Sequence, residues 1–146
     1  MSPAFPQPDW FLALGRLMEA EGERFRRLGY AEVRFAVGVM SDEGETFERA
    51  TGVEIAGYQL ARAVALDDVA GFDPDFVICA RRAIWQRMID EIARNGRPEP
   101  RHTLNSLALM GDELWLESSD QLREDKFYRF NQTLQELFNL VAQHSP

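Results

Sequence analysis

Apolar side chains recur at helical spacing near both ends of the chain. Over residues 10–28 they form one stripe of a helix that Asp9 is placed to cap and Gly29 to end. Over residues 127–141 the apolar positions fall within an arc of roughly 100°, and polar side chains occupy the opposite face. The pattern therefore predicts an amphipathic helix near each terminus.

The second of these helices is rich in aromatic rings, with three phenylalanines and one tyrosine over residues 126–141. Such a helix can close a dry core, line a ligand cavity or dock on a partner, and periodicity alone does not separate these roles. Ser118 and Gln121 fit a capping box at its start. We therefore expect this helix over residues 119–143.

Strict alternation of apolar and polar side chains predicts a half-buried strand over residues 31–40. A polar turn follows, and the next twenty or so residues have no helical stripe, so we predict two further strands over 46–56 and 58–66. After a loop, residues 75–80 form a short, continuously apolar strand. The clustered strands indicate an α+β sheet covered by helices.

Helical spacing returns after this strand, over residues 81–95, and Gly96 and Pro98 supply a stop signal. A short helix over 102–110 and an alternating strand over 112–118 precede the last helix. The predicted order is α-β-β-β-β-α-α-β-α. We expect one domain over residues 1–146, in which residues 1–8 form an extended lead-in.

The formal net charge of −8 disfavours contact with phosphate backbones, so we expect no nucleic-acid binding. Lys126 is the only lysine among sixteen cationic side chains, which we interpret as coding bias. A single cysteine, Cys79, excludes an internal disulfide framework, and the first residues lack the pattern of a secretion signal. No apolar run approaches the roughly 20 residues of a membrane span. We expect a cytoplasmic protein that is not an integral membrane protein.

Residues with catalytic or metal-binding chemistry are few. The two imidazoles, His102 and His144, do not make a metal site by spacing, and no nucleotide-binding or catalytic-triad motif is present, so we expect no metal and no cofactor. His102, with Asn105 one turn further on, is a candidate acid-base group. Glu21 points along the middle of the first helix's apolar stripe, where an unpaired carboxylate is costly.

Two further features have simple structural interpretations. Cys79 lies in the apolar strand, where a free thiol behaves as a small buried hydrophobe. Residues 81–102 carry six arginines against three acidic side chains, which is usual for a solvated helix face but can also attract an anionic head group. Neither feature by itself indicates an enzyme.

Part of the pattern is similar to a known family. The succession "DPDFVICARRAIWQRMIDEI", "HTLNSLALMGDELWLESSDQL" and an amphipathic terminal helix resembles the sterol carrier protein family of lipid-binding domains. In that family a strand leading into a Trp- or Phe-bearing helix precedes a small helix, a last strand of the G-x-L-x-L-x kind and a closing helix. Gly111, Leu114 and Leu116 occupy that last strand here.

The resemblance implies a five-stranded, mostly antiparallel sheet with helices on one side, enclosing a hydrophobic tunnel for fatty acids, acyl-CoA or sterol-like lipids. Members act as carriers or accessory domains, generally without a catalytic constellation. The residues expected to line the cavity are Trp10, Leu14, Phe35, Trp85, Met88, Ile89, Leu107, Phe127, Phe130, Leu134 and Phe138. The candidates for polar contacts with a head group are Glu21, Arg81 and His102.

Three hypotheses about function follow. The first is a carrier of an apolar small molecule, with no catalytic residues. The second is a small cofactor-independent lyase or isomerase that uses His102 or Glu21 as its acid-base group. The third is an interaction module that docks through its terminal helix. A homodimer or a lipid-metabolising enzyme as partner is compatible with the first and third.

Overall fold

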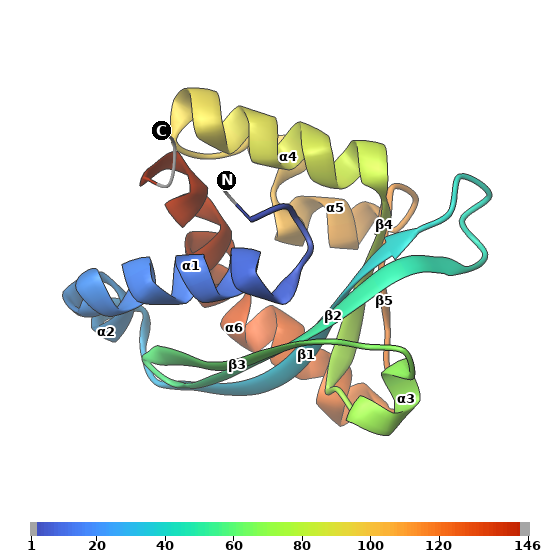
Figure 1. The fold of residues 1–146 in the computed structure, drawn as a ribbon, viewed down its shortest axis with the longest axis horizontal. Helices are drawn as coiled ribbons and strands as arrows, with labels where there is room; N and C mark the ends of the chain where they lie inside the picture. The colour runs from blue at the N-terminus through green and yellow to red at the C-terminus, as the bar shows by residue number, and fades with distance from the viewer. Residues whose placement is uncertain (1–2, 144–146) are drawn as a thin grey trace.

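The chain forms a five-stranded sheet with most of its helices on one face (Figure 1). The computed structural model describes residues 3–143. The strands are β1 (Ala31–Met40), β2 (Phe47–Gly57), β3 (Gln59–Ala65), β4 (Phe76–Arg81) and β5 (Leu114–Glu117). The helices are α1 (Pro8–Ala20), α2 (Gly22–Leu28), α3 (Val69–Phe72), α4 (Arg82–Asn95), α5 (Leu104–Met110) and α6 (Gln121–Asn139). Two 3-10 turns, η1 (Pro100–His102) and η2 (Leu140–Gln143), complete the order.

The strand order across the sheet is β3-β2-β1-β4-β5. Of these five described strands, the central pair β1 and β4 is parallel, and the other three pairs are antiparallel. The predicted α+β class, with a mostly antiparallel sheet, is therefore confirmed. The predicted order of elements is also confirmed, apart from one break in the first helix and one additional short helix, α3.

The first predicted helix is two helices, because the backbone leaves helical geometry at Glu21 (φ −101°, ψ 34°) just before Gly22. The prediction that Asp9 caps the first helix is wrong. Pro8 occupies the first turn, where its fixed φ suits a helix start, and Gln7 is the N-cap residue without a side-chain cap. Asp9 lies inside the first turn, where a negative charge favours the helix dipole.

The predicted capping box of the last helix is also wrong. Asp120 is the N-cap residue of α6, and its Oδ1 accepts a hydrogen bond from the backbone N–H of Arg123 at 2.9 Å. The Ser118 hydroxyl instead donates to the backbone carbonyl of Asp75 at 2.7 Å. Asp120 can cap because its backbone is extended and its carboxylate is free to fold back over the first turn.

The main core lies between the sheet and the layer formed by α1, α4, α5 and α6 (Figure 1). Alternate residues of β1 from Val33 to Val39 point into it, as the alternation predicted. The opposite face of β1 is not simply exposed, since Ala36, Gly38 and Met40 are also buried. A second, smaller apolar cluster therefore lies on the other face of the sheet, formed by Ala36, Met40, Val77 and Cys79 with Leu66, Val69 and Trp115 packed against it.

Two strand glycines make room for rings on this second face. A Cβ atom at Gly38 would lie 2.5 Å from the ring of Phe47, and one at Gly52 would lie 2.6 Å from the ring of Phe72. Phe72 ends α3, a helical turn in the segment that was predicted as loop. This turn places the Phe72 ring over Gly52 of β2. The absence of a side chain at these two glycines lets aromatic rings cover the strands directly.

The lead-in was predicted to be extended over residues 1–8. Residues 1 and 2 lie outside the described part of the chain, and the following residues form a turn in which the Gln7 N–H donates to the Ala4 carbonyl at 2.8 Å. The Thr51 hydroxyl donates to the carbonyl of Pro6, which attaches the turn to β2. The lead-in is thus folded onto the end of the core beside α1.

Candidate functional site

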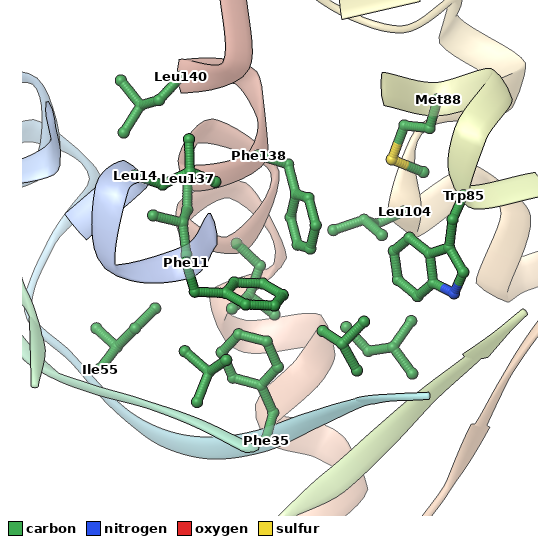
Figure 2. Packing of buried hydrophobic residues seen from close by; sticks show 14 of the residues in the cluster. Phe11, Leu14, Phe35, Ile55, Trp85, Met88, Leu104, Leu137, Phe138 and Leu140 are labelled. Carbon is green, nitrogen blue, oxygen red and sulfur yellow. The ribbon is translucent and has the colours of Figure 1, made fainter. Parts of the chain in front are cut away.

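A cluster of aromatic rings fills the space between the helices and the sheet. Phe138 of α6 stacks on Trp85 of α4 with ring centroids 5.7 Å apart, and meets Phe11 of α1 edge to face at 6.1 Å. Figure 2 shows these three side chains converging from three helices above Phe35 of β1. Sequence spacing could assign each ring to a helix face, but only the fold brings the three helices together.

The residues predicted to line a cavity all belong to this one core. Trp10, Leu14, Phe35, Trp85, Met88, Leu107, Phe127, Leu134 and Phe138 are buried, and Ile89 and Phe130 are partly buried against them. Five hollows on the surface of residues 3–143 are lined by other side chains. The predicted lining residues are thus neighbours, and in this structure they contact one another.

Phe5 of the lead-in lies over the outer end of the ring cluster. Its ring meets Trp10 edge to face at a centroid distance of 5.0 Å and lies 5.4 Å from Trp85. Phe5 is partly buried and packs against the main core, although it comes from the turn before α1. The lead-in therefore covers the gap between α1 and α4 with a single ring.

One surface hollow is bordered by Val33 and Ile55, which are both core residues. Its volume is about 490 Å³. Three cationic side chains, Arg34, Arg123 and Lys126, line it together with four acidic ones, Glu32, Glu54, Asp73 and Asp75. This charged hollow lies where the start of α6 faces β1 and β2.

The cations of the charged hollow are paired with carboxylates of its own lining. Arg123 makes two hydrogen bonds to Asp73, at 2.6 and 3.1 Å, and these bonds lower the pKa of Asp73 below its ordinary value. Asp75 is only 7 % exposed and accepts from the backbone N–H of Arg34 at 3.0 Å and from Lys126 Nζ at 3.2 Å. An anion entering the hollow would compete with these carboxylates for the same cations.

The three predicted head-group residues are not brought together. Glu21 lies between α1 and α2, half exposed, and accepts from Gln143 at 2.9 Å. Arg81 ends β4 and donates to the backbone carbonyl of Asp42 at 2.7 Å. Figure 1 places α2 and the loop between β1 and β2 at opposite ends of the molecule. Glu21 therefore does not point into the core: the stripe ends at the helix break, and Arg24 lies 3.8 Å away.

His102, the third candidate, is largely buried and paired with carboxylates. Its Nδ1 lies 2.8 Å from Glu91 Oε2 and 3.3 Å from Glu99 Oε2. Burial raises the pKa of Glu91, but the hydrogen bonds from the Glu99 N–H and the His102 ring outweigh it, so the pKa of Glu91 lies below its ordinary value. Glu91 and Glu99 were not predicted as partners of His102, and the only sequence signal for them was the Glu99-x-x-His102 spacing. His144 lies outside the described residues.

Cys79 is fully buried in β4, as its apolar neighbours predicted. Burial raises the pKa of its thiol far above the ordinary value, and the nearby carboxylate of Glu117 adds to the effect. The thiolate is the nucleophilic form of cysteine, and reactive cysteines have a lowered pKa and some exposure. Cys79 has neither property.

The ring-rich face of α6 packs inside its own chain. Phe127, Leu134, Leu137 and Phe138 are each 0 % exposed. Docking through the terminal helix could therefore not use these four side chains, although Leu122 and Tyr128 of α6 are exposed. Among the described residues, no helix combines the length and the apolar character needed to cross a bilayer.

Comparison with known proteins identifies the fold. No family model matches the sequence, and no curated protein matches it. Among solved structures, sterol carrier protein 2 superposes with a TM-score of 0.65 at 24% identity, over 96% of this chain and 98% of that one. A conserved hypothetical protein from Thermus thermophilus, described as possibly a sterol carrier protein, gives 0.62 at 25% identity over 98% and 90% of the two chains. Over nearly its whole length, the chain therefore has the α+β fold of the sterol carrier proteins.

Proposed function

We propose that the chain binds and carries an apolar small molecule, such as a fatty acid, an acyl-CoA or a sterol-like lipid, between its sheet and its helices. The observation that supports this most is the position of the aromatic cluster. In a chain with the sterol carrier fold, it lies between α1, α4, α6 and the inner face of the sheet. The lining residues would be those predicted from the sequence, from Trp10 to Phe138.

The hydrophobic effect is large enough for this function. Removing apolar surface from water yields about 25 cal/mol per Å². An acyl chain that buries several hundred Å² therefore reaches affinities of the order of micromolar, even after the costs of association and ordering. The rings can supply that contact surface if they separate around the ligand.

Binding would require part of the core to open, because the predicted lining residues contact one another. The lead-in is the smallest movable part of that boundary. The partly buried ring of Phe5, the buried Pro6, one turn hydrogen bond and one side-chain hydrogen bond hold it in place. Moving Phe5 away would open the space between Trp10 and Trp85. We therefore place the entrance for the ligand at the lead-in.

The head group of an anionic ligand would find cationic side chains at the charged hollow. This hollow borders the core residues Val33 and Ile55, and Arg34, Arg123 and Lys126 offer positive charge there beside four carboxylates. We propose this hollow in preference to Glu21, Arg81 and His102, since those three residues do not lie together. A carboxylate or phosphate would replace Asp73 or Asp75 as the partner of a cation.

The enzyme hypothesis has less support. His102 is paired with Glu91, and the five surface hollows are not lined by it. A general base must lie within hydrogen-bond reach of its substrate, in a site that the substrate can enter. Glu21 is half exposed at a helix junction, outside the core.

Titration of the delipidated protein with fatty acids and acyl-CoAs, followed by tryptophan fluorescence, tests the proposal. We expect one saturable site and a change in the emission of Trp10 and Trp85. Trp115 packs against the other face of the sheet, so Trp115→Phe should leave the ligand-induced change intact and serves as the matched control. Failure to observe saturable binding of any long-chain lipid would overturn the carrier function.

A further inference from the structure

Three side chains that are suited to binding a metal meet where the turn η1 folds back onto α4. We propose that Glu91, Glu99 and His102 form a binding site for one divalent transition-metal ion, with Zn²⁺ as its best occupant. Their ligand atoms all lie within 4.8 Å of one another. This site departs from the expectation of no metal that was drawn from the sequence, because Glu91 joins the other two only in the folded chain.

The distances between the donor atoms suit a shared ion. Zn²⁺ lies about 2.0–2.2 Å from imidazole nitrogen and carboxylate oxygen, so two ligands at a tetrahedral or octahedral angle are roughly 2.8–3.6 Å apart. His102 Nδ1 lies 2.8 Å from Glu91 Oε2 and 3.3 Å from Glu99 Oε2. Both distances from the imidazole nitrogen are thus compatible with a shared ion, which would replace the hydrogen-bonding proton.

The site is also held in place by its surroundings. The second oxygen of Glu91, Oε1, accepts a hydrogen bond from the Glu99 backbone N–H at 3.1 Å, which fixes the orientation of that carboxylate. The backbone N–H of His102 donates to the backbone carbonyl of Glu99 at 2.8 Å and closes the turn that carries these two ligands. Little rearrangement would therefore be needed on binding.

The burial of the Glu91 carboxylate favours the binding of a cation. The Glu91 side chain is 8% exposed and that of His102 15%, while that of Glu99 is 51% exposed. A buried carboxylate is costly without a positive partner, and a divalent ion satisfies two carboxylates at once. The exposed side, at Glu99, leaves room for water as a fourth ligand.

The donor set narrows the choice of ion. One imidazole nitrogen and two carboxylate oxygens suit Zn²⁺, Co²⁺ or Mn²⁺, whereas Ca²⁺ and Mg²⁺ prefer oxygen ligands alone. Mn²⁺ stands lowest in the general affinity order of these ions, and three His or carboxylate ligands with water in the fourth position are a usual Zn²⁺ coordination. A bound ion would link α4 to the segment that leads into α5, so its effect would be on stability.

Calorimetric titration of the chelator-treated, full-length protein with Zn²⁺ tests the site, with Co²⁺ absorption as a second readout. We expect one ion per chain, a higher melting temperature with Zn²⁺, and visible Co²⁺ bands that Zn²⁺ removes. Glu99→Gln should retain the fold, because this side chain is half exposed, and should weaken binding by about tenfold or more. His102→Gln should abolish the Co²⁺ bands.

Two control variants separate this site from incidental surface binding. Asp90→Asn changes the exposed neighbour of Glu91 on α4 and should leave Zn²⁺ affinity unchanged. His144→Ala removes the other histidine of the chain and should also leave it unchanged. Equal affinity in the native protein, Glu99→Gln and His102→Gln would overturn the proposal. Absence of binding at Zn²⁺ concentrations up to about 1 mM would overturn it as well.

Discussion

Phe130 and Phe138 lie on the same helix but in different surroundings. Phe138 is fully buried between Trp85 and Phe11, whereas Phe130 is only partly buried and lies 5.6 Å from the Arg129 guanidinium. We expect Phe138→Ala to lower the free energy of unfolding by about 3–5 kcal/mol, because a large cavity replaces the ring. Phe130→Ala should cost about 1–2 kcal/mol, since it removes fewer contacts. Denaturant titration distinguishes the two, and equal losses would contradict this assignment.

Cys79 should be chemically silent in the folded protein. Its thiol pKa is raised above that of the unfolded chain, so the unfolded state loses a proton first as the pH rises. The contribution of this thiol to the free energy of unfolding is therefore full below the ordinary thiol pKa of about 8.5 and declines above it. We expect native protein not to react with a thiol reagent at pH 8, and Cys79→Ala to show a weaker loss of stability at alkaline pH. Rapid labelling of native protein would contradict the prediction.

At the residue scale, the sequence predicted which side chains are buried better than which side chains they contact. The apolar periodicity correctly indicated the buried rings and the buried thiol, because each depends on the residue's own element. The partners of His102 could not be predicted, since Glu91 lies in α4 and reaches it only when η1 folds back. Glu21 shows the converse error: it was placed on an apolar stripe that the break before Gly22 interrupts.

At the element scale, Gly52 fixes how α3 covers the sheet. Phe72 lies on this glycine and between the guanidinium groups of Arg34 and Arg62, 5.4 and 5.6 Å from its ring. Gly52→Ala should lower the free energy of unfolding by about 1–3 kcal/mol, because the new methyl group displaces the ring. Combining it with Phe72→Leu, which relieves the overlap, should restore part of that loss. If the losses of unfolding free energy in Gly52→Ala and Phe72→Leu simply add in the double variant, the ring and the glycine are independent.

The start of α6 depends on Asp120. Its carboxylate satisfies an N–H of the first turn, so Asp120→Ala should cost about 1 kcal/mol in thermal or denaturant unfolding. Asp120→Asn should retain most of the stability, because an amide oxygen can accept the same bond. If the alanine and asparagine variants were equally destabilised, the carboxylate charge would matter and the cap would not.

Elements with a strong repeat were predictable, and their ends were not. The strands and the long helices follow periods that extend over many residues, so one exceptional residue does not change the assignment. A cap depends on a single side chain. Ser118 and Asp120 both fit the local pattern, but the Ser118 hydroxyl donates to the carbonyl of Asp75, in the segment before β4, and Asp120 caps the helix. The short helix α3 is four residues long, so it has no hydrophobic repeat from which it could be predicted.

At the scale of the whole molecule, the order of elements and the sheet class followed from the pattern and the family resemblance. The charged hollow did not, because it joins residues of β1, β2 and α6 with the segment before β4. Asp75, for example, accepts from the Arg34 N–H and from Lys126, which lie 41 and 51 positions away. Such contacts appear only when α6 packs across the sheet.

The lead-in should control how fast a ligand enters. If the core must open at Phe5, association is limited by that opening and is slower than diffusion. Phe5→Ala removes aromatic contacts with Trp10 and Trp85, each worth about 0.5–1.5 kcal/mol, so the closed state loses stability and association should accelerate severalfold. Stopped-flow tryptophan fluorescence with a fatty acid measures the rate.

Leu12→Ala provides the matched control for that experiment, because it removes an exposed apolar side chain from α1 without touching the cluster. Its association rate should equal that of the native protein. Faster association in Phe5→Ala alone would place the entrance between α1 and α4. An unchanged rate in Phe5→Ala would move the entrance elsewhere, and the hollow at Val33 and Ile55 would then be the place to test, since these two residues belong to the core.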